Sequence, residues 1–245
     1  MYLDVIDLRA FYGERLGLVA RRLIGQRLRA HWPSVAGESL LGIGYATPYL
    51  RNIGDGAERI IAFMPATQGV VNWPRDGPNA AALVAEDALP LPDASIDRVL
   101  VIHSLELAAN ARDQLREIWR ILAPGGRVLI VVPNRAGIWA RLEATPFGYG
   151  RPFGRTQITT LLRDAMLSPM GWSEALTVPP FRHRAWLRTG LTWERVGRLM
   201  WPAFAGVLIV EATKQVYQGI PARERNKRLK PAFRPALFPP GAQPT

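Results

Sequence analysis

Two apolar runs joined by an amphipathic segment constrain the fold of this chain most strongly. Residues 98–103 (RVLVIH) and 127–132 (RVLIVV) are rich in β-branched side chains and are bounded by turn residues, which is typical of strands. Between them, residues 111–122 carry apolar side chains at helical spacing, and Pro124-Gly125-Gly126 is expected to end this helix. Strands that are apolar throughout must be covered on both faces, so the pattern predicts a parallel sheet with helices on either side.

The same alternation continues along most of the chain. Further strands are predicted at residues 39–43, 59–64, 82–85, 175–178 and 206–213, and further helices over 4–30, 157–166 and 193–200. The order is five βα units followed by a β–α–β ending. We expect one domain over residues 1–217, made of a helical segment (1–35), a core (36–135) and a substrate-side part (136–217), and then a flexible tail over 218–245.

Composition excludes several kinds of chemistry. The chain has no cysteine, which removes disulfides, thiolate metal sites and cysteine nucleophiles. Its three histidines, His31, His103 and His183, are far apart in sequence, so no metal site is expected. The N-terminus lacks the pattern of a signal peptide and no apolar run reaches the roughly 20 residues that span a bilayer. A cytoplasmic protein without a transmembrane segment is therefore expected.

The net charge of +11 is concentrated near the C-terminus. Seven basic residues and one acidic residue follow residue 213, in a segment dense in proline. This tail lacks regularly interleaved aromatic residues, so specific nucleic-acid binding is not expected, although contact with an anionic partner through the tail stays open.

A pair of glycines follows the first predicted strand, in the sequence LLGIGYATPYL at residues 40–50. Such a turn can bring backbone N–H groups close to a nucleotide-like ligand. A plain strand-to-helix turn accounts for Gly42 and Gly44 equally well, so the pair carries weight only together with its neighbours.

Two longer segments supply those neighbours. EDALPLPDASIDRVLVIHSLEL (residues 86–107) and LREIWRILAPGGRVLIVVPNR (residues 115–135) resemble the class I S-adenosylmethionine-dependent methyltransferases, in particular the type 11 group. The resemblance covers residues 36–135 in the right order. It implies a Rossmann-like α/β fold with a doubly wound, seven-stranded, mostly parallel sheet whose last strand is antiparallel.

The resemblance also implies where S-adenosylmethionine binds. The glycine turn would pass under its methionyl part, Asp87 would accept a hydrogen bond from the adenine amino group, and Ala88 and Leu89 would line the adenine pocket. The end of the fourth strand would face the methionine portion, and Tyr12 would pack over the cofactor. The residues implied in cofactor binding are Tyr12, Gly42, Ile43, Gly44, Tyr45, Ala46, Met64, Asp87, Ala88, Leu89, Ile102 and His103.

The sequence departs from the family pattern at two acidic positions. Leu40 stands where the first strand usually bears an acid, and Met64 ends the second strand where an acid usually holds the ribose hydroxyls. A lost charge-assisted hydrogen bond would weaken binding by about 1.5–3 kcal/mol. Thr67 or Gln68 would then contact the ribose instead, and the Met64 thioether would support the adenine ring.

The resemblance implies methyl transfer to a small-molecule or lipid-like acceptor, with S-adenosylhomocysteine as the product. An acceptor whose pKa lies well above 7 also needs a general base, and His103 is the candidate because sites lie at strand ends in open α/β sheets. A histidine that merely hydrogen-bonds at a strand end is the alternative. A second reading is a methyltransferase-like protein that has lost catalysis and binds a partner, supported by Leu40 and Met64. A third is methylation of RNA or protein assisted by the tail.

Overall fold

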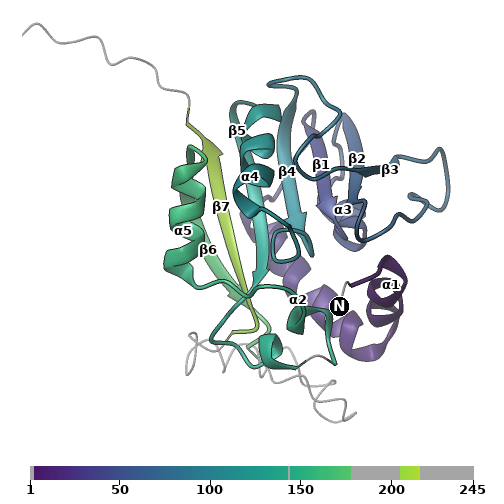
Figure 1. Ribbon diagram of the computed structural model, residues 1–245. Coiled ribbons are helices and arrows are strands. Elements are labelled where there is room, and N and C mark those ends of the chain that lie inside the picture. The colour runs from purple at the N-terminus through teal and green to yellow at the C-terminus, as the bar shows by residue number, and fades with distance from the viewer. Residues whose placement is uncertain (1–2, 143, 178–204, 216–245) are drawn as a thin grey trace, which may run out of the picture.

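The computed structural model describes residues 3–142, 144–177 and 205–215, and these build one seven-stranded sheet (Figure 1). Its strand order is β3-β2-β1-β4-β5-β7-β6. Strands β1 to β5 run parallel, while β7 is antiparallel to both of its neighbours, β5 and β6. The strands are β1 (Ser39–Gly44), β2 (Arg59–Pro65), β3 (Ala81–Val84), β4 (Ile96–Ile102), β5 (Leu122–Pro133), β6 (Leu167–Ala175) and β7 (Val207–Lys214). The expected mostly parallel sheet with an antiparallel last strand is confirmed.

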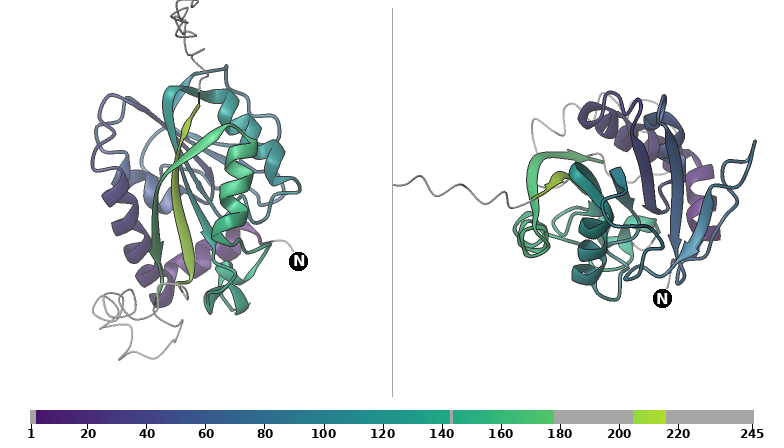
Figure 2. Two further views of the ribbon diagram at one scale, coloured as in Figure 1. Left: turned by 90° about the vertical axis from the view of Figure 1, so that its left-hand side faces the viewer. Right: turned by 90° about the horizontal axis from the view of Figure 1, so that it is seen from above.

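Helices cover both faces of the sheet, as its apolar strands require (Figure 2). On one face pack α1 (Val5–Gly13), α2 (Arg15–His31) and α3 (Thr47–Ile53). On the other pack α4 (Ala111–Ile121) and α5 (Arg155–Asp164). Two short 3₁₀ helices, η1 (Trp139–Arg141) and η2 (Pro146–Gly148), follow β5. Successive residues of each central strand alternate between the two cores, so every central strand is buried on both sides.

The expectation of five βα units is wrong in the half of the sheet that carries β2 and β3. No helix connects β2 to β3 or β3 to β4; residues 66–80 and 85–95 form irregular connections. The first connection contains two glycines and two prolines, and the second contains two prolines. These residues interrupt helices, and the cost of Pro in a helix interior is about 3 kcal/mol.

The strand predicted at residues 175–178 is also misplaced. Strand β6 ends at Ala175 and begins at Leu167, where the sequence predicts the end of a helix. Pro169 and Gly171 are residue types that rarely occur inside strands, so the sequence pattern does not indicate this one. The pairing of β6 with β7 shifts its register between these two residues. An edge strand tolerates proline because one side of it has no ladder to complete. The helix predicted at 193–200 and the tail at 218–245 lie outside the described residues.

One buried carboxylate connects the C-terminal end of α2 to strands β6 and β7 at one edge of the sheet. Glu211 on β7 accepts hydrogen bonds from Trp32 Nε1 at 3.1 Å and from Arg127 at 3.2 Å, and its Oε2 lies 3.2 Å from His31 Nδ1. The other ring nitrogen of His31 lies 2.9 Å from the Ser173 hydroxyl on β6. Burial alone would raise the pKa of Glu211, but these hydrogen bonds hold it below its ordinary value.

Replacing this carboxylate tests its role in stability. Glu211→Gln is expected to lower the free energy of unfolding by about 1.5–3 kcal/mol, because three donors lose a charged acceptor. Since the folded pKa is lowered, this contribution is present above the ordinary glutamate value of 4.5 and is lost as pH falls below it. Denaturant unfolding at pH 7 and pH 4 measures the difference, and exposed Glu58→Gln is the control. A difference that does not shrink at low pH would contradict the assignment.

Candidate functional site

The glycine turn after β1 is a point of close backbone approach. Gly44 has a φ of +80°, a conformation that glycine adopts without strain. A Cβ atom there would lie 2.3 Å from the carbonyl oxygen of Ile102, at the end of β4. A Cβ at Gly42 would lie 2.7 Å from that of Ala46, in the turn that leads to α3. The glycine pair therefore lets β1, β4 and α3 meet tightly at the carboxyl edge of the sheet.

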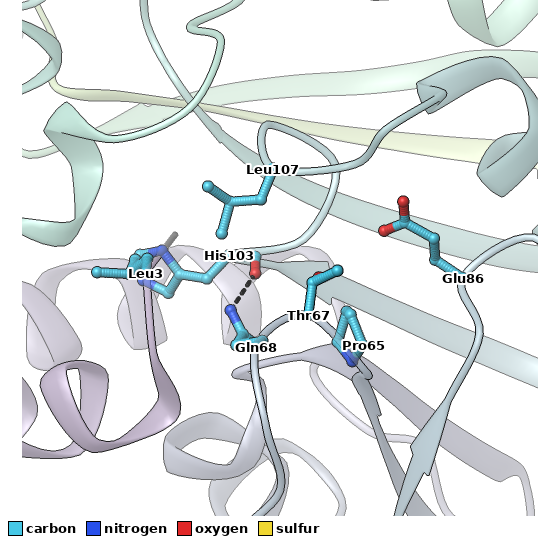
Figure 3. Close-up of a pocket in the computed structure, with 7 residues that line it drawn as sticks. All are labelled: Leu3, Pro65, Thr67, Gln68, Glu86, His103 and Leu107. Carbon is cyan, nitrogen blue, oxygen red and sulfur yellow. Dashed lines mark hydrogen bonds between the residues drawn. The ribbon is translucent and has the colours of Figure 1, made fainter. Parts of the chain in front are cut away.

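A pocket opens at this edge, between the ends of β2, β3 and β4 (Figure 3). It holds about 260 Å³ of empty space, part of which is open to solvent. Because part of this space is open solvent, a nucleoside cofactor needs more room than the pocket offers as it stands. Its lining residues are Leu3, Pro65, Thr67, Gln68, Glu86, His103 and Leu107.

The acid that lines this pocket is Glu86, not its neighbour Asp87. Glu86 extends along the side of the pocket opposite Leu3, and its Oε1 accepts a hydrogen bond of 2.8 Å from the Ala109 N–H (Figure 3). Asp87 and Ala88, which the resemblance assigns to the adenine site, are exposed, and Leu89 is buried. The sequence shows two acids side by side at this position, but the local pattern does not tell which of the two side chains faces the pocket.

Helix α4 fixes the loop that carries these residues. Arg120 donates to the carbonyl oxygens of Leu89 and Leu91 at 2.9 and 2.8 Å, and to Asp93 at 2.7 Å. Glu117 accepts the Leu89 N–H at 3.0 Å and forms an ion pair of 2.8 Å with Arg120. The hydrogen bonds of Arg120 hold the pKa of Glu117 below its ordinary value. The loop after β3 is thus held by side chains, although it has no helix of its own.

The two positions that depart from the family pattern are filled by apolar packing. Leu40 and Met64 are buried in the core, and the Met64 sulfur accepts the Val71 N–H at 3.4 Å. Gln68 is buried and donates from Nε2 to the carbonyl oxygen of His103 at 2.8 Å (Figure 3). Thr67 is exposed and lines the pocket. Of the two residues proposed to contact the ribose in place of an acid, Thr67 has the more accessible side chain.

His103 sits in a strained position at the end of β4. Its φ is 52°, which is uncommon for a residue other than glycine and is found preferentially at functional sites. The side chain is fully buried, and its Nε2 lies 2.8 Å from the hydroxyl of Tyr12 on α1. Its Nδ1 lies 3.6 Å from Oε1 of Glu106, a carboxylate that is also buried. Tyr49 on α3 donates to the Tyr12 hydroxyl at 3.0 Å.

Aromatic rings enclose this histidine. The ring of Tyr12 stacks on that of Tyr45, with centroids 5.6 Å apart and planes 29° from parallel. Phe147 on η2 lies 4.9 Å from the imidazole. Burial, together with Tyr49 and Glu106 nearby, raises the pKa of Tyr12 well above its ordinary value, so this phenol keeps its proton.

The structure therefore divides the predicted residues into two groups. Tyr12, Gly44, Tyr45, Ile102 and His103 meet at the carboxyl ends of β1 and β4, with Gly42, Ile43 and Ala46 in the same turn. Asp87 and Ala88 lie on the outside of the next loop, and Met64 is buried under Val71. Sequence reasoning missed Glu86 as a lining residue and Tyr49, whereas Glu106 lies on a loop where the sequence allows either a site residue or a cap or turn residue.

Two kinds of feature are absent from the part of the chain that the structure describes. It contains no group of three or more histidine and acidic side chains that could hold a metal ion. Over the same residues, no helix is long and apolar enough to cross a membrane.

The anchoring of the loop after β3 is open to test. Arg120→Ala removes the hydrogen bonds to Leu89, Leu91 and Asp93, so amide hydrogen exchange over residues 86–93 should become at least tenfold faster, because the loop then opens locally at lower cost. Arg116→Ala, one turn earlier on α4, is the control because exposed Arg116 pairs with Asp113 on the same helix. Equal exchange in both variants would show that the loop is held by something else.

Comparison with known proteins gives the site a context. Residues 40–130 match the family model of the methyltransferase domain. No curated protein matches the sequence.

Several solved structures share the fold at low sequence identity. A chain from the complex between the Haloferax volcanii Trm112 methyltransferase activator and a methyltransferase has a TM-score of 0.60 at 19% identity, over 85% of this chain and 97% of that one. The [4+2]-cyclase SpnF has a TM-score of 0.54 at 20% identity, over 80% and 82% of the two chains.

The 1,6-didemethyltoxoflavin-N1-methyltransferase of Burkholderia thailandensis, solved with S-adenosylhomocysteine, has a TM-score of 0.52 at 17% identity, over 80% of this chain and 79% of that one. At these identities the likeness concerns the fold alone, and one such fold belongs to a cyclase, so the reaction has to be argued from the site. The family match runs from β1 into β5, so the part of the sheet that carries the glycine turn and the strand-end histidine is similar to the methyltransferase domain.

Proposed function

We propose that this protein transfers a methyl group from S-adenosylmethionine to a small-molecule or lipid-like acceptor and releases S-adenosylhomocysteine. One observation carries the proposal. The glycine turn of β1 packs against the end of β4, and directly beside it lies a pocket that combines a carboxylate, a hydroxyl and an amide with apolar side chains. This mixture suits a nucleoside, which has polar edges and an apolar ring face.

The residues present fit the cofactor once α1 makes room for it. Thr67 and Glu86 offer a hydroxyl and a carboxylate to the adenosine part, and Leu3, Pro65 and Leu107 offer apolar surface. The turn around Gly44 would lie under the methionyl part. Tyr12 and Leu3 currently fill the space in front of β4, so binding requires the N-terminal segment to shift.

The protein's share of the reaction is to align the acceptor and to exclude water. The bound cofactor supplies an electrophilic methyl group, and such a displacement needs reactants held in line. The aromatic rings of Tyr45 and Phe147 at the carboxyl edge provide a dry wall that favours an apolar acceptor. His103 is the group at this edge that accepts the acceptor's proton.

A binding or regulatory protein without catalysis is the alternative. It is favoured by the apolar packing of Leu40 and Met64, where the family has acids, and by the Tyr12 ring in front of β4. Cofactor binding separates the two proposals.

Calorimetric titration with S-adenosylhomocysteine tests the proposed function. We expect a dissociation constant at or below about 100 μM, equivalent to about −5.5 kcal/mol. Glu86→Gln should weaken binding about ten- to a hundredfold, because a charged acceptor is lost from the pocket. Asp87→Asn, at the exposed neighbouring position, should change it less than threefold.

The binding of S-adenosylhomocysteine by the two variants and by the wild-type protein separates the alternatives. A large loss in Asp87→Asn with none in Glu86→Gln would place the adenine where the resemblance alone predicts it. Absence of binding by the wild-type protein, together with absence of ligand carried through purification, would favour the non-catalytic alternative.

Methylation of RNA or protein with the help of the tail is tested by deletion. A protein that ends at residue 217 loses six of the seven basic residues after position 213. If the acceptor is a small molecule, the truncated protein should keep its affinity for S-adenosylhomocysteine. RNA binding should be weak and salt-dependent in both proteins, and truncation should weaken it only as far as the lost positive charges require. Loss of tight RNA binding in the truncated protein would support the nucleic-acid reading, and filter binding at two salt concentrations measures it.

A further inference from the structure

A chain of hydrogen-bonding groups crosses the carboxyl edge of the sheet and includes more than the strand-end histidine. From α3 to the turn after β4 it runs through Tyr49, Tyr12, His103 and Glu106, with separations of 3.0, 2.8 and 3.6 Å. Each of the four side chains is buried. Within the described residues, the carboxylate that faces the imidazole is that of Glu106.

The direction of the chain follows from which groups hold protons. Burial raises the pKa of both tyrosines, so both phenols stay protonated. Tyr49 donates its hydrogen to the Tyr12 oxygen, and Tyr12 therefore has its own hydrogen to donate to Nε2 of His103. An imidazole that accepts at Nε2 carries its hydrogen on Nδ1, which faces the carboxylate of Glu106.

Several polar atoms around this chain lack partners. Nδ1 of His103, Oε2 of Glu106 and Oε1 of Gln68 are buried and have no hydrogen-bond partner within the described residues. Each such atom costs about 1–3 kcal/mol, and a buried carboxylate costs more. Proteins keep an arrangement like this where it has a task, and the left-handed backbone of His103 is a second strained feature at the same place.

We propose that Glu106 is a positioning residue that holds His103 in the Nδ1–H tautomer. Nε2 is then free to take the proton from a methyl acceptor that bears a hydroxyl group. In the cofactor-free protein, the Tyr12 phenol occupies the place of that hydroxyl group. Tyr12 has the two features that such an acceptor needs, a ring stacked on Tyr45 and a hydroxyl on Nε2. The inference rests on the proposed methyl transfer for its role in catalysis, but the geometry can be tested without the cofactor.

The proposed reaction balances. The hydroxyl proton of the acceptor passes to Nε2, which makes an imidazolium that Glu106 stabilises. The electron pair freed on oxygen forms the bond to the methyl carbon, and the pair of the carbon–sulfur bond leaves with the thioether. An alcohol or phenol, whose own pKa lies well above 7, needs such a base, whereas a carboxylate acceptor does not.

The tautomer is measured by nitrogen NMR of protein labelled at histidine. The chain has only three histidines, and His103→Gln identifies the signal of interest. In the cofactor-free wild-type protein we expect His103 to be protonated at Nδ1 alone. In Tyr12→Phe this should persist, because Glu106 still fixes the ring. In Glu106→Leu the Nε2–H form should appear, because the negative charge that faces Nδ1 is gone while Tyr12 can still accept through its oxygen.

Two further variants keep the test decisive. Glu106→Gln preserves the shape of the side chain and serves if Glu106→Leu does not fold; its amide can donate to Nδ1, so it should also populate the Nε2–H form. Asp113→Asn removes a partly exposed carboxylate on α4 and should leave the tautomer unchanged. A wild-type Nε2–H tautomer, or one that no Glu106 variant alters, would overturn the positioning role.

A ligand pair tests the stand-in role of Tyr12. With S-adenosylhomocysteine present, p-cresol should displace Tyr12 and shift the Nε2 signal, whereas 4-methylanisole, which has no hydroxyl hydrogen, should not. Equal shifts with both compounds, or with neither, would overturn the hydroxyl assignment. A correct tautomer in a protein that does not bind S-adenosylhomocysteine would instead show that the chain of hydrogen bonds exists and that the proposed methyl transfer fails.

Discussion

The close approach of β1 to the end of β4 is the constraint on which the site depends. Gly44 leaves no room for a side chain between its own Cα and the carbonyl oxygen of Ile102, and this contact fixes the turn into α3. The residue directly after β4 is His103, whose backbone is left-handed and whose carbonyl oxygen accepts a hydrogen bond from Gln68. Because β1 and β4 pair in the middle of the sheet, the imidazole is placed by two strands that are hydrogen-bonded on both sides.

Two energetic trends oppose each other around that histidine. The apolar packing of Met64 and Phe147 stabilises this edge of the sheet, whereas the buried carboxylate of Glu106 and the strained backbone destabilise it. Tyr12 offsets part of this cost, because its hydroxyl forms a hydrogen bond with Nε2 of His103 and its ring packs in front of β4. The same contact obstructs the site, so binding of any ligand in front of β4 has to compensate for the loss of the Tyr12 hydrogen bond.

The sequence predicts those features that depend on residues close together in the chain. Apolar runs and the residues that interrupt helices were enough to predict all strands but β6, and Gly42 and Gly44 marked the turn at the site. Strand β6 was missed because Pro169 and Gly171 break its pattern, and only pairing with β7 makes it a strand. The contact between Tyr12 and His103 joins residues 91 positions apart, and the choice between Glu86 and Asp87 depends on how Arg120 holds the loop. Such features follow from tertiary packing, which no local pattern contains.

A crystal structure of the protein grown with S-adenosylhomocysteine would test the proposed site most directly. We predict adenosine beside Glu86 and Thr67, the amino-acid part of the ligand over the Gly44 turn, and the Tyr12 hydroxyl moved away from Nε2 of His103. Ligand bound elsewhere, or at this edge with the contact between Tyr12 and His103 intact, would contradict it.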